Sequence, residues 1–448
     1  MIEKNKNYDV KILDMGIEGE GIAKIDGYTT FIKGAITGED AEIKMVKVNK
    51  DFGFGKLLKI NKTSDEREEP MCDVFGRCGG CNLQHLNYES QLLHKVNIVK
   101  STLKKQLGYE PLVDEIIGMG IPYYYRNKVQ YPVSGGKIGF YADRSHELIE
   151  NEECFIQNQY IDKLAKFAFS VLKKYNSSFY DEKTEKGTFR HIVARIGVST
   201  SEVMLIFVTN GETFKNKEKI LNEILKEYPE ITSIIQNINL TNGNVILGDK
   251  CLTLYGEDYI CDRLGDYKFK ISPLSFYQVN PRQTEVLYEI AKEFARLSGC
   301  ETVFDLYCGI GTISMYMSDK SKKVYGVEVV PQAIENAKEN AELNEVTNTE
   351  FIVGEVEKVI PKMYEEGIKA DVVFVDPPRK GCDITVIQTI IDMKPEKLVY
   401  ISCNPATLAR DLKVLTEEAF EIKKIKLVDM FPQTSHVETC VLLALKSQ

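Results

Sequence analysis

The sequence predicts an α/β protein in which a small all-β unit, a mixed α+β unit and a doubly wound α/β unit follow one another. Residues 1–62 contain short β-rich runs between glycines. Residues 63–270 mix strand-like runs with helical patterns, and residues 271–448 alternate strands with helices. With 448 residues the chain is also too long for one ordinary domain, and about three domains are expected.

Composition limits the class of protein. The start MIEKNKNYDV has no apolar signal region, and no apolar run approaches the ~18 residues of a membrane span. The net charge of −9 argues against an extended polyanion-binding surface of the histone type, but a local basic groove suffices for an enzyme that handles one nucleotide. We therefore expect a soluble cytoplasmic protein without a membrane partner, and RNA stays among its candidate ligands.

Residues 1–62 have the pattern of a five-stranded OB-like barrel. Four runs rich in β-forming residues lie between glycine-bearing turns at positions 16, 19, 21, 27, 34 and 38. They are Tyr8 to Ile12, Thr29 to Ile32, Ala41 to Val48 and Gly55 to Ile60. Lysines gather beside Phe52 and Phe54, which suits single-stranded RNA because aromatic rings stack on bases. A solvated barrel face with two core phenylalanines is the alternative.

The chain has 11 cysteines, and a reducing compartment favours metal or catalytic use over disulfides. Three have the spacing C-x5-C-x2-C, and a fourth follows in a charged context. They are Cys72, Cys78, Cys81 and Cys154. A zinc site is the nearest rival, but zinc usually uses paired C-x2-C knuckles. We expect a closed [4Fe-4S] cluster with a structural or RNA-organising role, for which His85 and His94 are weaker candidate ligands.

The middle of the chain predicts a mixed α+β unit. An amphipathic helix is expected from Tyr88 to Leu107 and another from Ile161 to Tyr175. Expected strands are Lys137 to Tyr141, His191 to Gly197, Val203 to Thr209 and Ser233 to Asn239. Basic side chains in this unit are candidate phosphate contacts, with ordinary surface charge as the alternative for each. They are Arg126, Lys128, Arg190, His191 and Arg195.

From residue 271 the pattern is that of a doubly wound sheet. Pro281 opens a helix that Gly299 closes, and Pro331 opens another. Expected strands are Thr302 to Leu306, Val324 to Val327, Phe351 to Val353, Asp371 to Val375, Leu398 to Ile401, Glu421 to Leu427 and Val437 to Leu445.

A nucleotide site is predicted where the first of these strands meets its helix. The run DLYCGIGT, from Asp305 to Thr312, contains two glycines that let the backbone approach a ligand. Glu328 ends the next strand about 20 residues later, where a carboxylate can bind a ribose diol. The third glycine of the dinucleotide fingerprint is missing, and Asp305 would face a cation. S-adenosylmethionine therefore fits better than a nicotinamide cofactor.

Two turns after later strands carry reactive side chains. Asp376 precedes two prolines that stiffen the backbone, and an arginine, Arg379, stands where amino-group methyltransferases carry an aromatic residue. Cys403 lies in a Ser-Cys-Asn-Pro turn at the carboxyl end of a strand, where open α/β sheets place their chemistry. Taken alone, Cys403 reads as a small buried thiol at least as well as a nucleophile.

Together these pieces resemble the RNA uracil-5-methyltransferases. The matching motifs lie in order along the last third of the chain. They are Ser275 to Asn280, DLYCGIGT, Gly326 to Glu328, Asp376 to Arg379, Ser402 to Pro405 and His436 to Thr439. The front barrel resembles a TRAM domain, and the four cysteines resemble the cluster ligands of the rRNA-directed members.

The resemblance implies a fold and a partner. The fold is a Rossmann-like class I methyltransferase domain over 271–448, behind a TRAM domain over 1–62 and a central iron-sulfur and RNA-binding domain over 63–270. The helix at about 88–110 is expected to pack on the catalytic domain. The implied substrate is 23S rRNA, with tRNA as the alternative, and DNA is not expected as a substrate. The enzyme is expected to be a monomer.

The resemblance also assigns roles. Cys403 adds to carbon 6 of uracil, which makes carbon 5 nucleophilic toward the methyl group of S-adenosylmethionine. Glu438 then removes the proton from carbon 5. Arg379 or Arg410 is expected to favour the thiolate, and His436 is a candidate for orienting the RNA. The S-adenosylmethionine site is implied to contain Gln278, Tyr307, Glu328 and Asp376.

Two rival classes remain. An amino-methyltransferase built on the Asp-Pro-Pro turn would need neither Cys403 nor Glu438. A metal-cluster RNA-binding protein with a decayed methyltransferase fold would have no use for an intact glycine loop, for Glu328 or for Cys403.

Overall fold

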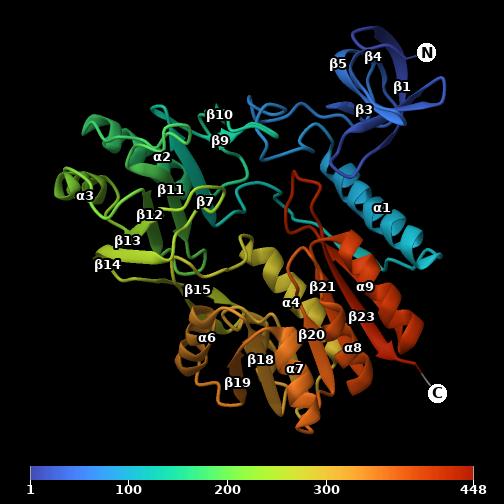
Figure 1. The fold of residues 1–448 in the computed structure, drawn as a ribbon, viewed down its shortest axis with the longest axis vertical. Helices are drawn as coiled ribbons and strands as arrows, with labels where there is room; N and C mark the ends of the chain where they lie inside the picture. The colour runs from blue at the N-terminus through green and yellow to red at the C-terminus, as the bar shows by residue number, and fades with distance from the viewer. Residues whose placement is uncertain (1, 447–448) are drawn as a thin grey trace.

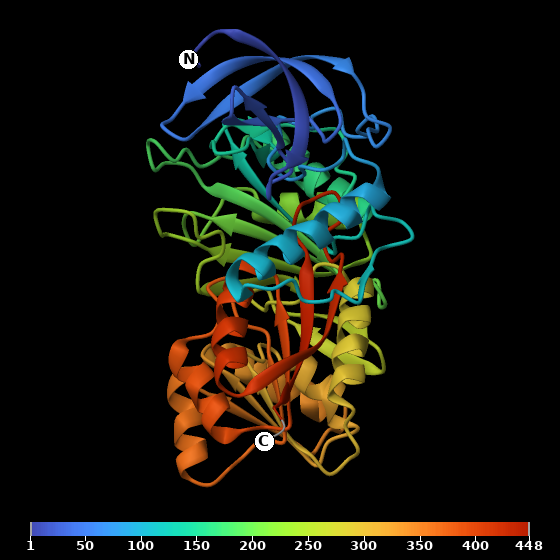
Figure 2. The same ribbon diagram turned by 90° about the vertical axis from the view of Figure 1, so that its right-hand side faces the viewer.

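The computed structural model describes residues 2–446 and places the units along one long axis, with the N-terminal barrel at one end and the C-terminal α/β unit at the other (Figures 1 and 2). Within this range, none of the helices combines the length and apolar character needed to cross a bilayer.

The N-terminal unit is a closed five-stranded barrel with strand order β1-β2-β3-β5-β4, which confirms the predicted architecture. The strands are β1 (Asn7–Met15), β2 (Gly21–Ile25), β3 (Tyr28–Lys33), β4 (Asp40–Val48) and β5 (Phe52–Lys62). The strand β2 falls where a glycine turn was expected. Gly21 is required there because a Cβ atom would lie 2.8 Å from the carbonyl oxygen of Ala35.

The central unit is a six-stranded sheet of order β14-β13-β12-β11-β7-β8. Its strands are β7 (Lys128–Ser134), β8 (Lys137–Ile138), β11 (Phe189–Ile196), β12 (Val203–Thr209), β13 (Ile231–Ile238) and β14 (Lys250–Gly256). The helices α2 (Gln159–Lys174) and α3 (Lys217–Glu227) cover one face. The other face shares a core with the C-terminal unit, so every residue of β12 is buried.

Several central elements differ from expectation. The strand expected over Lys137 to Tyr141 breaks at Gly139, a position that needs glycine because a Cβ would lie 2.1 Å from the carbonyl oxygen of Ile149. Its second half, β9 (Phe140–Tyr141), pairs with β10 (Leu148–Ile149) instead. The elements α3 and β14 and the hairpin of β15 (Ile260–Leu264) and β16 (Tyr267–Ile271) were not predicted.

The C-terminal unit is an eight-stranded sheet of order β19-β18-β17-β20-β21-β23-β22-β6. Its strands are β6 (Glu115–Ile117), β17 (Thr302–Leu306), β18 (Lys323–Glu328), β19 (Thr349–Val353), β20 (Val372–Val375), β21 (Lys397–Ser402), β22 (Phe420–Val428) and β23 (Glu438–Leu445). The strands from β17 to β21 are parallel, and β23 runs antiparallel to β21 and β22. This is the predicted doubly wound sheet, in which β23 is the antiparallel strand and β6 is an edge strand that was not predicted.

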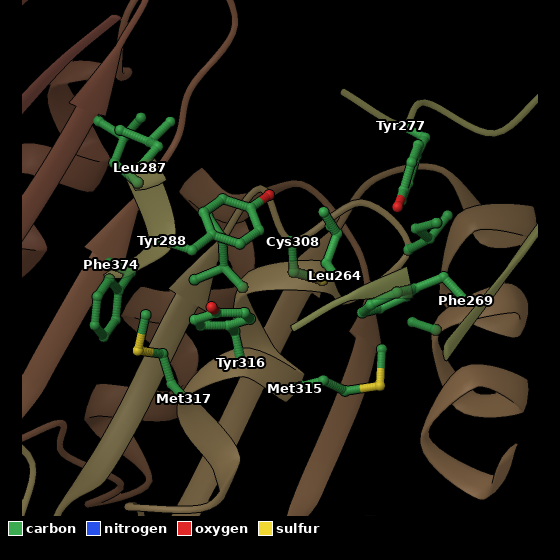
Figure 3. Packing of buried hydrophobic residues seen from close by; sticks show 14 of the residues in the cluster. Leu264, Phe269, Tyr277, Leu287, Tyr288, Cys308, Met315, Tyr316, Met317 and Phe374 are labelled. Atoms are coloured by element: carbon green, nitrogen blue, oxygen red, sulfur yellow. The ribbon is translucent and has the colours of Figure 1, made fainter. Parts of the chain in front are cut away.

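Helices cover both faces of this sheet. One face packs on α4 (Pro281–Ala295), α5 (Thr312–Ser318) and α6 (Pro331–Leu343), and Figure 3 shows part of that core. The other face packs on α7 (Val356–Glu365), α8 (Ile384–Met393) and α9 (Pro405–Glu418). The helix α4 ends earlier than predicted, since Arg296 rather than Gly299 adopts the left-handed cap conformation, with φ 47°.

One early segment packs on this C-terminal unit. The helix α1 (Tyr88–Leu107) has the predicted bounds and lies beside α9 (Figure 2). Val99 and Leu103 are fully buried in the core that it shares with the C-terminal unit. The strand β6 follows it and pairs in parallel with β22. Asp114 fixes this contact, because its carboxylate accepts a hydrogen bond from the Ile425 N–H at 2.7 Å.

Candidate active site

The predicted site residues converge at one edge of the C-terminal sheet. The glycine loop follows β17, Glu328 ends β18, Asp376 follows β20 and Cys403 follows β21. These are the carboxyl ends of parallel strands, and the strand order reverses direction between β17 and β20, where open sheets bind ligands. Glu438 begins the antiparallel strand β23 and therefore reaches the same edge.

The glycine loop brings bare backbone to this edge. Tyr307, Gly309 and Gly311 have φ values of 70°, 56° and 82°, all in the left-handed region. The Tyr307 N–H donates to the carbonyl oxygen of Val327 at 2.9 Å, which ties the loop to the neighbouring strand. A Cβ on Gly311 would lie 2.9 Å from the Phe351 ring, so only glycine fits where α5 begins.

Glu328 is already oriented by backbone donors. Its carboxylate accepts hydrogen bonds from the Gly309 N–H at 3.3 Å and the Val330 N–H at 2.9 Å. An ionised carboxylate has about four acceptor sites, so two remain for the hydroxyls of a ribose. The geometry fits the predicted role.

Asp305 provides a buried acceptor for a cationic ligand. One carboxylate oxygen accepts from the Ser314 hydroxyl at 2.5 Å, while the other is buried without a partner among residues 2–446. Burial raises the pKa of Asp305 to about 7, and the nearby Glu328 charge adds to the rise. A ligand ammonium group would satisfy this acceptor and favour the ionised form.

Asp376 lies on the neighbouring strand end, since Leu306 and Val375 pair in register. Burial and then the Asp305 charge raise the pKa of Asp376 to about 7. Two carboxyl groups with raised pKa values therefore lie side by side at the switch point. A sulfonium or ammonium group suits this surface better than a phosphate does.

Cys403 and Glu438 meet through strand register. Ser402 pairs with Thr439 in the antiparallel β21 and β23 ladder, so the next positions outward are Cys403 and Glu438. Burial raises the pKa of Cys403 to about 11, and the Glu438 and Asp376 charges contribute. Burial and then Asp376 raise the pKa of Glu438 well above its ordinary value. A thiol and a carboxyl group with a raised pKa therefore lie on neighbouring strands at this edge of the sheet.

The two arginines expected to act on the thiol have different surroundings. The Arg379 charge lowers the pKa of both Cys403 and Glu438. Arg410 instead donates to the Asp411 carboxylate at 2.7 Å and to the Cys382 carbonyl at 3.0 Å. Arg410 thus holds the loop after β20 against α9.

The other cofactor-site residues have different surroundings. The Gln278 carbonyl accepts from the Asn127 side-chain amide at 3.1 Å, which joins this loop to the central unit, and no protein partner engages the Gln278 side-chain amide within the described residues. Tyr307 contributes its backbone to the glycine loop, but its ring packs with the core around Cys382 on the face covered by α8 and α9. The roles of both side chains stay predictions.

The four predicted ligand cysteines line a single cavity of about 240 Å³. Burial raises the pKa of Cys81 and Cys154 to about 12, so these thiols need a cationic partner to ionise. Across residues 2–446, no group of three or more His, Cys, Asp or Glu side chains is arranged to hold a metal ion. The cavity and its four sulfur donors nevertheless fit a cluster that binds one cysteine at each iron. His85 and His94 do not line the cavity.

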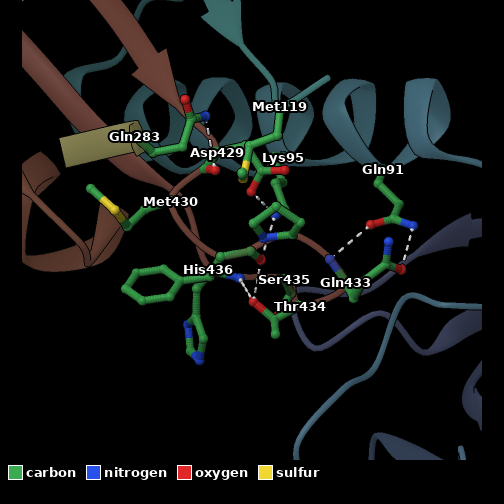
Figure 4. Close-up of polar contacts among 12 residues, drawn as sticks. Gln91, Lys95, Met119, Gln283, Asp429, Met430, Gln433, Thr434, Ser435 and His436 are labelled. Atoms are coloured by element: carbon green, nitrogen blue, oxygen red, sulfur yellow. Dashed lines mark hydrogen bonds and ion pairs between the residues drawn. The ribbon is translucent and has the colours of Figure 1, made fainter. Parts of the chain in front are cut away.

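Sequence reasoning missed a buried ion pair behind the site. Lys95 of α1 donates to the Asp429 carboxylate at 2.5 Å, and both side chains are fully buried. Gln91 and Gln433 exchange hydrogen bonds of 3.0 and 3.1 Å in the same contact (Figure 4). Residues 429–436, which lead into Glu438, are thereby fixed to α1. The sequence showed only the apolar stripe of α1. A lysine next to that stripe resembles any surface lysine, so its burial could not be predicted.

Known proteins share this arrangement. The profile of the tRNA (Uracil-5-)-methyltransferase family matches residues 250–446, and the TRAM domain profile matches residues 3–58. A Clostridium tetani protein described as an uncharacterized RNA methyltransferase is 50% identical over 446 residues, covering 99% of this chain and 97% of that protein. A Listeria innocua protein of the same description is 48% identical over 450 residues, covering 100% of this chain and 99% of that protein.

A solved structure extends the similarity to the whole fold. The Pyrococcus abyssi tRNA (uracil-54, C5)-methyltransferase, in complex with S-adenosyl-L-homocysteine, has a TM-score of 0.80 and 28% identity, covering 98% of this chain and 100% of that one. The glycine loop, Glu328 and the two acidic strand ends agree with S-adenosylmethionine as the methyl donor. The chain belongs to the family of S-adenosylmethionine-dependent RNA uracil-5-methyltransferases.

Proposed function

We propose that this enzyme methylates carbon 5 of a uridine in 23S rRNA through a covalent adduct between Cys403 and the base. The observation that carries the proposal is the pairing of Cys403 and Glu438 at the ends of neighbouring strands, beside Asp376 and Arg379. An enzyme that methylates an exocyclic amine would need the Asp-Pro-Pro turn, but it would not need a thiol opposite a buried carboxylate.

The first role belongs to Cys403. Carbon 5 of uracil is too electron-poor to attack a methyl sulfonium, so a thiolate must first add to carbon 6. Arg379 favours that thiolate, while burial, Glu438 and Asp376 oppose it. S-adenosylmethionine supplies the methyl group that carbon 5 then attacks.

The second role belongs to Glu438. After methylation, carbon 5 carries a proton that must leave before the bond between carbon 6 and the Cys403 sulfur can break. A carboxylate whose pKa is raised by burial is a stronger base than a solvated one. Glu438 takes this proton, and elimination releases the thiolate and the methylated base.

The cofactor is held by the edge described above. Glu328 binds the ribose with the acceptor sites that Gly309 and Val330 leave free. Asp376 would face the cationic end of the cofactor, and Gln278 and the backbone of Tyr307 would complete the site.

The cavity lined by Cys72, Cys78, Cys81 and Cys154 is proposed to hold a [4Fe-4S] cluster. Its place supports a structural role. The N–H groups of Asn82 and Leu83, directly after the third cysteine, donate to the Gln433 carbonyl at 3.1 Å in the segment that leads to Glu438.

The barrel offers an aromatic surface for unpaired RNA. Phe31, Phe52 and Phe54 pack with ring centroids 5.7 to 5.9 Å apart, and the Lys47 ammonium lies 5.9 Å from the Phe54 centroid. Phe52 is 40% exposed, so a base can stack on it. We assign RNA binding to residues 1–62, cluster and RNA binding to 63–270, and catalysis to 271–448, within a cytoplasmic monomer.

A tRNA uridine is the second candidate target. The front barrel and the cysteine set support rRNA through their resemblance to the rRNA-directed enzymes. The P. abyssi neighbour acts on tRNA uracil 54 and yet covers 98% of this chain, so overall architecture alone does not separate the two.

Nucleoside analysis tests the target. Ribosomal and transfer RNA from a strain lacking the gene are digested separately, and 5-methyluridine is measured by mass spectrometry. Loss from 23S rRNA, restored by wild-type enzyme but not by Cys403→Ala, is the expected result. Loss only from tRNA would establish the alternative, and an unchanged 5-methyluridine content in both would reject the proposed function.

A further inference from the structure

Four of the five basic residues of the central unit that were candidate phosphate contacts divide into two groups. Arg190 and Arg195 are buried and engaged with backbone. Arg190 donates to the carbonyl oxygens of Asn239 and Thr241 at 2.9 and 2.7 Å. Arg195 donates to the Ser275 carbonyl at 3.2 Å. These two guanidinium groups hold chain segments in place and are not free to bind a ligand.

Arg126 and Lys128 differ because no acidic side chain pairs with them. In the described part of the chain, neither forms an ion pair with a carboxylate, and the Lys128 ammonium has no acceptor. Lys128 lies directly opposite Arg195 across the β7 and β11 ladder. Burial, then Arg195 and Arg126, lowers the pKa of Lys128 to about 7. Both are half-buried, which sets them apart from the exposed lysines that also lack a carboxylate partner.

These two cations lie at the junction with the catalytic edge. Asn127, between them, donates through its backbone N–H to the Val279 carbonyl at 2.8 Å and through its side chain to the Gln278 carbonyl at 3.1 Å. Burial lowers the pKa of His436, and the charges of Arg379, Lys95 and then Arg126 add to this, so Arg126 lies near that histidine. His436 stands two residues before Glu438.

We propose that Arg126 and Lys128 form a phosphate subsite that binds an RNA phosphodiester at or next to the target uridine. Enzymes that act on a base must take it out of its stack, and backbone contacts fix the register of the displaced nucleotide. A phosphate placed here supplies the anion that both side chains lack. The identification of the ligand as RNA rests on the proposed function, whereas the anion site rests on the two unpaired cations.

Arg126 has a second neighbour that shapes the test. Its side chain also lines the four-cysteine cavity, where its Nε atom is buried without a partner. A change at Arg126 can therefore affect a cluster as well as RNA. Lys128 does not line the cavity, so it is the position that reports on RNA alone.

Salt dependence of RNA binding tests the subsite. Fluorescence anisotropy with a short labelled oligouridylate is measured across a potassium chloride series for wild type and Lys128→Gln. Removal of one phosphate contact is expected to lower the slope of log K against log salt by about 0.7 and to weaken binding at low salt. Lys128→Arg should keep the wild-type slope. Lys219→Gln, an exposed lysine on α3, is the matched control.

Arg126→Gln serves as a second variant if Lys128→Gln does not fold, with cysteine-bound iron measured alongside. An unchanged slope and affinity in the folded variants would overturn the proposal. A variant that loses methylation but binds RNA as tightly as wild type would also overturn the proposal. That result would mean that the residue positions the 278–280 segment and does not bind a phosphate. Failure of the proposed function gives a different result. Wild-type protein would then still bind oligouridylate with full salt dependence, but deletion of the gene would leave the 5-methyluridine content of cellular RNA unchanged.

Discussion

Cys403 lies in surroundings that oppose its ionisation when no substrate is bound. Burial and the carboxyl groups of Glu438 and Asp376 raise its pKa to about 11, and Arg379 is the cation that counters them. An ordinary thiol is already only a few per cent ionised at neutral pH, and this one is ionised less. Cys403 is therefore held in its thiol form in the free protein, and its proposed role as nucleophile requires substrate binding to change the local charge.

Alkylation of Cys403 by iodoacetamide should report this balance. In the free enzyme its rate should rise with pH toward an apparent pKa of about 11. Arg379→Gln should raise that pKa and slow the reaction, because a favourable positive charge is lost. Glu438→Gln should lower the pKa and speed the reaction at alkaline pH, because a negative charge is lost. Peptide mass spectrometry gives the rates, with exposed Cys300 as internal reference. Equal rates in all three proteins would contradict the account.

Glu328 should contribute directly to cofactor affinity. Glu328→Ala is expected to weaken S-adenosylmethionine binding by about 1.5–3 kcal/mol, the range for a lost hydrogen bond to a charged group. Glu350→Ala removes an exposed carboxylate from the adjacent strand β19 and should change little. Calorimetry measures both. Wild-type affinity in Glu328→Ala would show that the carboxylate serves only Gly309 and Val330.

At the scale of elements, α1 acts as a brace for the segment that delivers Glu438. Lys95 and Asp429 are both fully buried, and the Tyr88 hydroxyl donates to the second Asp429 oxygen at 2.7 Å. A buried pair of this kind costs desolvation on both sides but fixes geometry when its hydrogen bonds are complete. The entry to β23 is thus set by a helix more than 300 residues earlier in the chain.

Breaking this pair should be costly. Lys95→Met leaves the Asp429 carboxylate buried without its cation and is expected to lower the free energy of unfolding by roughly 3–5 kcal/mol. Lys105→Met changes an exposed lysine of the same helix and should be nearly neutral. Urea unfolding followed by circular dichroism compares the two. A loss below about 1 kcal/mol in Lys95→Met would mean that the brace is dispensable.

Element prediction succeeded where a local pattern decides the structure. The apolar stripe of α1 gave its bounds, and Pro331 marked the start of α6. It failed where distant packing decides. The strand β2 contains a glycine that reads as a turn, and β6 has only three residues, paired with β22 far along the chain. No local signal separates such segments from loops.

At the scale of the whole molecule, the cysteine cavity joins separate parts of the chain. Three cysteines precede α1, and Cys154 follows β10, while the segment after Cys81 bonds to the Gln433 carbonyl. A cluster held here would tie the central unit to the segment leading to Glu438. The C-x5-C-x2-C spacing predicted a metal-type site; the four cysteines line one cavity, but no metal-holding group is formed among residues 2–446, so the ligand set stays a prediction.

Anaerobically purified protein should therefore be brown, with iron and sulfide near four each per chain, as expected for a cluster held by four thiolates. Cys154→Ser should lose most of this iron and unfold more readily, whereas Cys300→Ser, at an exposed cysteine outside the cavity, should retain both. Metal analysis and thermal unfolding measure the outcome. About one equivalent of zinc with no sulfide would show that the four cysteines bind zinc instead of a cluster.

The catalytic pairing shows how far residue patterns alone reach. The strand ends and the glycine loop could be placed from the sequence, because strand–turn–helix periodicity locates them. The meeting of Cys403 and Glu438 depends on the register of an antiparallel strand inserted beside β21, which periodicity does not encode. That pair came from resemblance to known enzymes. Neither the residue pattern nor the resemblance predicted the ion pair between Lys95 and Asp429, because in sequence a buried lysine on an amphipathic helix resembles any surface lysine.

The most direct test of the account is the fate of the adduct between Cys403 and RNA. Wild type with 5-fluorouridine RNA and S-adenosylmethionine should give a slow, denaturation-resistant protein–RNA band, because fluorine cannot leave as a proton does. Glu438→Gln should accumulate the same methyl-labelled band on ordinary RNA, since methyl transfer precedes its step. Cys403→Ala should never form it and should not turn over. Full activity in Cys403→Ala, or methyl groups on an exocyclic amine instead of carbon 5, would contradict the mechanism.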